Sequence, residues 1–169
     1  RALELGDQGV WALTLEGDLH GTYYDYEVTV ASRSARTADP YAAAAGRNGV
    51  RSMAVNLSRT DPEGFSADCP PPVQPENIIY ELHVKDFSYD AGSGIPEQYR
   101  GKFKAFSWRD KDGRLPLCME HLKGLGVTHV QLLPIYDFGS VDEGGDDKQF
   151  NWGYDPMNYN LPEGSYSTD

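Results

Sequence analysis

The first third of the chain alternates apolar and polar residues with the period of a β-strand. The alternation runs through residues 10–15 and 23–30, and a shorter run follows at residues 53–57. The segment between the first two runs is rich in glycine and aspartate, which is typical of a turn. Short strands with one apolar face each predict part of an antiparallel β-sandwich within residues 1–60. Three strands are few for a complete sandwich, so we expect this module to be incomplete.

A proline-rich stretch interrupts the strand pattern. Five of the 11 prolines lie within residues 62–75, and three of them, Pro70, Pro71 and Pro72, are consecutive. Proline fixes φ and has no amide donor, so this stretch is neither a helix nor a central strand. The sequence therefore predicts a stiff linker over residues 61–75.

Beyond the linker, the pattern becomes that of an α/β unit. Residues 78–85 alternate as a strand that ends at Asp86, and residues 127–133 form a second apolar strand. Between them, residues 116–125 place apolar side chains on one helical face, with Pro116 in the first turn and glycine at the end. Strand, helix and strand in this order predict a right-handed βαβ unit with parallel strands.

Polar side chains accompany both predicted strands. Parallel α/β sheets hold ligand groups just past the carboxyl ends of their strands, where this chain carries Asp86 and Asp137. A catalytic carboxylate pair is one interpretation, and a turn cap or a partner for arginine is the other, which we favour. We interpret His83 and Glu81, on one face of the first strand, as a satisfied core pair. His129 lies inside the second strand and is expected to be packed.

Residues 139–169 show no clear periodicity and predict a long functional loop. Carboxylates in its acidic part, residues 142–147, make calcium binding possible, but their spacing does not match an EF-hand, so a solvated loop is the default interpretation. Residues 150–156 combine aromatic rings with amide and carboxylate groups, which suits a sugar ligand. We favour a binding role for Tyr154. Trp152 either contacts a ligand or pins the loop to the body of the protein.

Composition and charge narrow the possible partners. The 169 residues include 26 acidic and 15 basic side chains, which gives a net charge of -11. This charge repels nucleic-acid phosphates and anionic membrane surfaces, so we expect neither partner. No apolar run approaches the roughly 20 residues of a membrane span, and a soluble chain is expected. Cys69 and Cys118 are too few for a disulfide framework and are interpreted as buried or incidental thiols, which leaves the compartment open.

Three segments of the second half carry recognisable motifs. They are residues 78–88 (IIYELHVKDFS), 122–138 (LKGLGVTHVQLLPIYDF) and 151–169 (NWGYDPMNYNLPEGSYSTD). Together they resemble the type I pullulanases, α-1,6-glucan debranching enzymes of the α-amylase superfamily of glycoside hydrolases. Phe150 stands where that family usually has a tyrosine. Parts of residues 17–57 also resemble the end of the starch-binding-type β-sandwich that precedes the catalytic barrel in these enzymes.

The resemblance implies a two-part fold and an activity. Residues 1–60 would be the last part of a β-sandwich carbohydrate-binding-type module, and residues 76–169 the first βαβ part of a (β/α)8 TIM barrel. Such a barrel cleaves α-1,6 branch linkages in pullulan, starch or glycogen with retention of configuration. Its catalytic carboxylates come from the fourth, fifth and seventh strands, which we do not expect within this chain. We therefore assign no catalytic residue, expect the chain alone to be inactive, and expect no required cofactor, calcium being possible.

The resemblance also assigns binding residues. Tyr154 matches the tyrosine that stacks on the sugar in the subsite just before the scissile bond, and Asp155 and Trp152 match neighbours that shape the same wall. An α-glucan is the expected partner. Two alternatives stay open, a non-catalytic glucan-binding module and a branching or transferring relative in the same superfamily, although the segment NWGYDP argues against the second.

Overall fold

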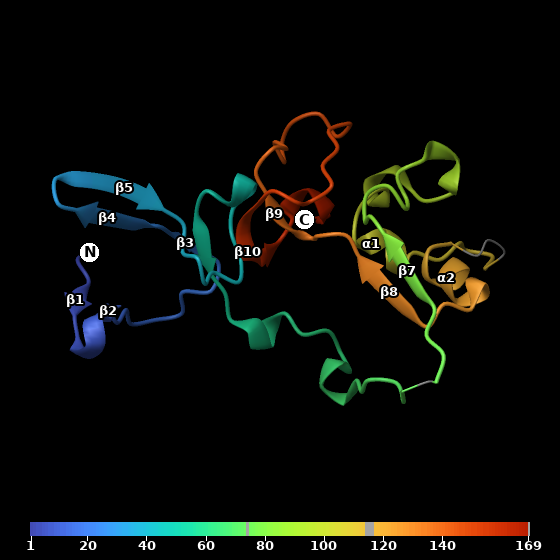
Figure 1. The fold of residues 1–169 in the computed structure, drawn as a ribbon, viewed down its shortest axis with the longest axis horizontal. Coiled ribbons are helices and arrows are strands. Elements are labelled where there is room, and N and C mark those ends of the chain that lie inside the picture. Colours follow the sequence, from blue (N-terminus) through green and yellow to red (C-terminus); the bar gives the residue numbers. More distant parts are fainter. Residues whose placement is uncertain (74, 114–116, 169) are drawn as a thin grey trace.

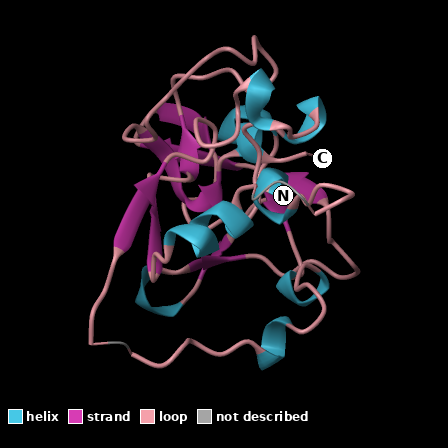
Figure 2. Ribbon diagram, turned by 90° about the vertical axis from the view of Figure 1, so that its right-hand side faces the viewer, coloured by secondary structure: helices cyan, strands magenta, loops and turns pink. Residues whose placement is uncertain are grey.

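The computed structural model describes residues 1–73, 75–113 and 117–168. Within these residues the chain forms five two-stranded sheets, two short α-helices and several 3-10 turns. The sheets are spread along the molecule (Figure 1), with β4 and β5 at one side, β7 and β8 at the other, and β9 and β10 between them. A second view shows the same small sheets joined by long loops (Figure 2). No helix in the described ranges has the length and apolar character needed to cross a membrane.

The strand pairs of the first third are all antiparallel, as the alternation predicts. They are β1 (Glu4–Leu5) with β2 (Trp11–Ala12), β3 (Thr22–Tyr24) with β6 (Ser52–Ala54), and β4 (Tyr26–Val30) with β5 (Arg33–Thr37).

Three expectations for this region need correction. The strand expected over residues 10–15 is only two residues long, and the run expected over 53–57 ends at Ala54. The strand expected over residues 23–30 breaks at Asp25, because its two halves pair with different partners, β6 and β5. Strand β5 was not predicted, since its sequence RSART has no alternating apolar residues.

The linker region and the βαβ unit agree with the sequence pattern. Residues 61–73 contain one 3-10 turn, Phe65–Ala67, and neither a strand nor an α-helix. Strands β7 (Ile79–Leu82) and β8 (His129–Leu132) are parallel, with α2 (Met119–Leu125) between them in the chain. The helix ends at Gly126, whose φ of 73° is the left-handed value that glycine tolerates at a helix end.

The boundaries of the βαβ unit differ from the prediction. Strand β7 ends at Leu82 rather than Asp86, because the chain turns at once, with the Phe87 amide donating to the His83 carbonyl oxygen at 3.0 Å. The described part of the helix begins at Met119, and the predicted first-turn Pro116 lies outside the described residues. The segment between β7 and α2 adds short elements without a sequence signal: the 3-10 turns Ala91–Ser93 and Glu97–Tyr99, and α1 (Lys104–Ser107).

The prediction of a strandless loop after Phe138 is wrong. Strand β10 (Pro156–Pro162) lies within it and pairs antiparallel with β9 (Tyr136–Phe138), and the 3-10 turn Gly164–Tyr166 follows. Two register shifts interrupt the pairing, so the strand shows no regular alternation. Asp137 therefore lies inside a strand rather than just past the end of one.

The buried core lies in the second half of the chain. One cluster joins the turn after β7 to β9 and the last 3-10 turn, and a second cluster lies around α1, with Phe106 contacting both. The buried members are Val84, Phe138 and Tyr166 in the first cluster and Ile95, Ala105 and Cys118 in the second. This core fixes the turn after β7 against the segment that follows β9.

Candidate functional site

The side chains of Trp152 and Tyr154 project from the loop between β9 and β10. They are 64 % and 67 % exposed, so Trp152 does not pin the loop to the body of the protein. Gly153 between them is buried, has a φ of 86°, and lies so close to Pro134 that a Cβ there would approach the Pro134 carbonyl oxygen to within 3.0 Å. The backbone at Gly153 thus packs closely against the segment that follows β8, and the aromatic rings of both neighbouring residues are exposed.

Hydrogen bonds within the loop fix its shape. The Asn151 side chain accepts from the Gly153 amide at 2.7 Å and donates to the Asp155 carboxylate at 2.7 Å. Ser140 donates to the other oxygen of Asp155 at 2.5 Å, which, together with Asn151, holds the pKa of this carboxyl below its ordinary value. Asp155 is therefore ionised, and both of its oxygens accept hydrogen bonds within the loop that carries Tyr154.

His83 contacts this loop from the core side. It is 7 % exposed, its Nε2 lies 2.7 Å from the Asn151 carbonyl oxygen, and its ring centroid lies 4.7 Å from that of Phe150. The expected core pair with Glu81 is not formed, because Glu81 is exposed. No motif signals this contact, since it joins positions 68 residues apart.

The remaining polar residues of the two strands do not form one site. Asp86 is exposed in the turn after β7, whereas Asp137 is 3 % exposed within β9. His129 was expected to be packed, but it is exposed on β8 and its Nδ1 lies 2.8 Å from the Thr128 hydroxyl. The two aspartates therefore lie in different surroundings, Asp86 exposed in a turn and Asp137 buried within a strand.

The acidic run is paired with cationic side chains of the protein. Asp142 forms an ion pair with Arg47 at 2.6 Å, which holds the pKa of its carboxyl below the ordinary value. Asp147 lies 3.8 Å from Lys85 and 3.9 Å from Lys102. The run is mostly exposed, as the default interpretation of a solvated loop expects, and two of its carboxylates also lie next to cationic side chains.

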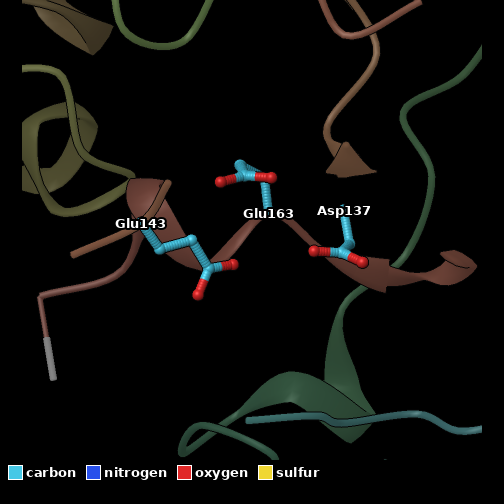
Figure 3. A group of neighbouring side chains, drawn as sticks. All are labelled: Asp137, Glu143 and Glu163. Atoms are coloured by element: carbon cyan, nitrogen blue, oxygen red, sulfur yellow. The ribbon is translucent and has the colours of Figure 1, made fainter. Parts of the chain in front are cut away.

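Three other carboxylates converge on a cleft of about 700 Å³ that residues 43–47 help to line. Oxygens of Asp137, Glu143 and Glu163 all lie within 4.8 Å of one another (Figure 3). Burial raises the pKa of Asp137 and of Glu143 above their ordinary values.

The three carboxylates also accept hydrogen bonds from the protein. The donors are the Asn158 side chain to Asp137 at 2.6 Å, the Asn48 amide to Glu143 at 2.7 Å and the Phe138 amide to Glu163 at 3.1 Å. The spacing would suit a cation bound by oxygen ligands, and protonation of Asp137 or Glu143 relieves the same repulsion. Sequence reasoning missed this group, because its members become neighbours only when β9, its following loop and the end of β10 fold together.

Comparison with known proteins places nearly the whole chain in one group of enzymes. No protein-family model matches the chain. The pullulanase of Bacillus subtilis (strain 168) is 37 % identical over 166 residues, which are 96 % of this chain and 22 % of that protein. Pullulanase 1, chloroplastic, of Arabidopsis thaliana is 32 % identical over 205 residues, with 95 % of this chain and 21 % of that protein covered.

Solved structures lead to the same group. The pullulanase of Paenibacillus barengoltzii in complex with maltohexaose and alpha-cyclodextrin is 46 % identical, with a TM-score of 0.89 over 99 % of this chain and 27 % of that one. The pullulanase of Bacillus acidopullulyticus is 43 % identical, with a TM-score of 0.86 over 98 % of this chain and 21 % of that one. The chain spans about a fifth of the length of the curated relatives that it matches. By sequence and by structure, therefore, the chain belongs with the pullulanases, of which it matches one segment.

Proposed function

We propose that this chain supplies α-glucan-binding surface to a debranching glycoside hydrolase that cleaves α-1,6 linkages in pullulan, starch or glycogen. The observation that carries the proposal is the exposed ring of Tyr154 on a loop fixed by Asn151 and Asp155. Exposed aromatic faces stack on the C–H faces of sugars, and a rigid loop loses little conformational entropy on binding. Relatives of the chain are named pullulanases, and one of the similar structures contains maltohexaose. Both observations support an α-glucan as the ligand.

Three residues have roles in this proposal. Tyr154 stacks on the sugar next to the scissile bond. The ring of this sugar flattens as it approaches an oxocarbenium-like state. Trp152 extends the aromatic surface, and Asp155 holds the loop in shape. The catalytic carboxylates belong to parts of the enzyme other than this segment, so the chain binds without cleaving. Calcium has no required part in binding.

The proposed domain organisation follows the resemblance. Residues 1–60 are the last part of a β-sandwich carbohydrate-binding-type module, residues 61–75 are the linker, and residues 76–169 begin a (β/α)8 barrel. The antiparallel pairs before the linker and the parallel β7–β8 pair after it support this division.

Titration with maltotriose tests the binding proposal. We expect the chain to bind maltotriose in isothermal titration calorimetry, and Tyr154→Ala to weaken binding at least tenfold while the far-ultraviolet circular dichroism stays unchanged. Tyr159→Ala is the matched control, because Tyr159 is also 67 % exposed but lies on β10 rather than in the loop. Equal affinities of the two variants would contradict the assignment of Tyr154.

A non-catalytic glucan-binding module is the second candidate, favoured by the exposed tyrosines. Both candidates bind glucan, and they differ in what the parent gene encodes. A parent protein with a full barrel should release reducing ends from pullulan, whereas a binding module should release none. A branching or transferring relative would instead change the chain-length distribution without net release of reducing ends.

A further inference from the structure

The turn after β7 holds the backbone that leads into the Tyr154 loop. Lys85 Nζ donates to the Gln149 carbonyl oxygen at 2.7 Å and also to the carbonyl oxygen of Asp147. His83 Nε2 lies 2.7 Å from the Asn151 carbonyl oxygen. Two side chains of one turn thus hold three alternate carbonyl groups of the incoming segment.

The hydrogen-bond partners of His83 determine its tautomer. Its Nδ1 accepts from the Asp86 amide at 3.1 Å, and a carbonyl oxygen such as that of Asn151 can only accept. The ring is therefore neutral with its proton on Nε2, an assignment made from the partners of the two nitrogens.

The surroundings of His83 leave its ring little freedom. The Phe150 ring lies against one face, and the Tyr166 hydroxyl oxygen lies 3.0 Å from Nε2. Tyr166 is itself buried in the first core cluster. Core packing therefore fixes the position of the His83 donor, and the donor in turn fixes the Asn151 carbonyl group.

A short path connects His83 to Tyr154. The Asn151 side chain accepts from the Gly153 amide and donates to the Asp155 carboxylate. Gly153 and Asp155 are the two chain neighbours of Tyr154. Displacing Asn151 would therefore move both ends of the peptide unit that carries the Tyr154 ring.

We propose that His83 is a positioning residue, whose Nε2–H bond to the Asn151 carbonyl oxygen sets the place of Tyr154 for an α-glucan. This inference rests on the proposed function for the identity of the ligand, but its structural part does not. His83 has no contact with the sugar in this scheme and acts only through Asn151. Lys85 assists by holding the two earlier carbonyl groups.

The test compares two substitutions that differ in the donor. His83→Leu removes it, whereas His83→Gln keeps an amide N–H near the position of Nε2. His129→Leu is the matched control, because His129 is an exposed histidine of β8. The loop is followed by 19F NMR of the chain labelled with 5-fluorotryptophan, in which Trp152 is one of three tryptophans and is assigned with Trp152→Phe.

We expect His83→Leu to shift or broaden the Trp152 signal, to leave the other two tryptophan signals unchanged, and to raise the Kd for maltotriose at least tenfold. His83→Gln should restore the signal and bring the Kd for maltotriose to within threefold of the value for the unsubstituted chain. The inference is overturned if His83→Leu leaves the Trp152 signal and the Kd unchanged, or if His83→Gln behaves like His83→Leu.

Two further outcomes are also decisive. If His83→Leu unfolds the chain, His83→Phe replaces it, since phenylalanine keeps an aromatic ring beside Phe150 and Tyr166 and has no hydrogen-bond donor. An unchanged Trp152 signal in His83→Phe then overturns the inference. If the unsubstituted chain does not bind maltotriose, the proposed function fails. The Trp152 signals alone then decide whether His83 positions the loop.

Discussion

Gly49 is a position at which one added methyl group should damage the fold. It has a φ of 60°, and a Cβ there would overlap the carboxylate of Asp137 and the side-chain amide of Asn158, both at less than 3.0 Å. The Asn158 amide also donates to the Gly49 carbonyl oxygen at 3.2 Å. Gly49→Ala therefore strains the backbone and separates a buried hydrogen-bonded pair at the same time.

The size of the effect follows from these two costs. Placing alanine in the left-handed region costs about 1–2 kcal/mol. Opening the 2.6 Å bond between Asn158 and the buried Asp137 leaves polar groups unsatisfied, which costs about 1–3 kcal/mol. We expect Gly49→Ala to lower the free energy of unfolding by about 3 kcal/mol.

Gly64→Ala separates the two contributions. Gly64 has a φ of 83°, but a Cβ there would meet no other atom within 4 Å, so this variant carries the backbone cost alone. With a urea m-value of about 2 kcal/mol/M, the unfolding midpoints of the two variants should differ by about 1 M. Urea titration followed by tryptophan fluorescence measures this difference. Equal midpoints would refute the claim that residue 49 packs against β9 and β10.

Three further predictions concern charge, thiols and a turn. Burial raises the pKa of the Asp137 carboxyl in the folded chain, so its contribution to stability is complete below the ordinary pKa of about 3.9 and is lost as pH rises through the pKa of the folded state. Asp137→Asn should therefore flatten the decline of the urea midpoint above about pH 4. An unchanged slope would contradict this. Cys69 is exposed and Cys118 is buried with a raised pKa, so a thiol reagent should modify one thiol in the folded chain and two in urea. Ala31 has a φ of 56°, so Ala31→Gly should raise Tm, with circular dichroism as the measurement and a lowered Tm as the contrary result.

The elements with a strong local pattern were predictable from the sequence. Strand β7, helix α2 and strand β8 have regular apolar periodicity and a glycine stop signal at Gly126, and the parallel pairing follows from their order. Strand β5 and strand β10 were missed for opposite reasons. β5 has only one apolar residue, Ala35, and pairs through a two-residue turn, whereas the alternation of β10 is obscured by its register shifts.

The candidate site was predictable only in part. Local composition and the family resemblance pointed to Tyr154 and Trp152, and both rings are exposed, while their role in sugar binding stays a prediction. The support behind them was not visible, since the His83–Asn151 contact and the Asp137–Glu163 proximity depend on packing between distant segments. Periodicity reports which face of an element is buried, but it does not report which partner covers that face.

The contacts of Asn48 with Glu143 have a consequence for the order of folding. The backbone amide of each residue donates to the side chain of the other, at 2.7 and 2.9 Å, across 95 positions of sequence. The β4–β5 hairpin closes over two residues and needs no distant partner. Because closing a long loop costs more entropy than closing a short one, the hairpin should form in the early phase of refolding and the Asn48–Glu143 contacts in the last. Kinetic intermediates of this chain should therefore have a formed hairpin and a separate, independently moving β9–β10 region.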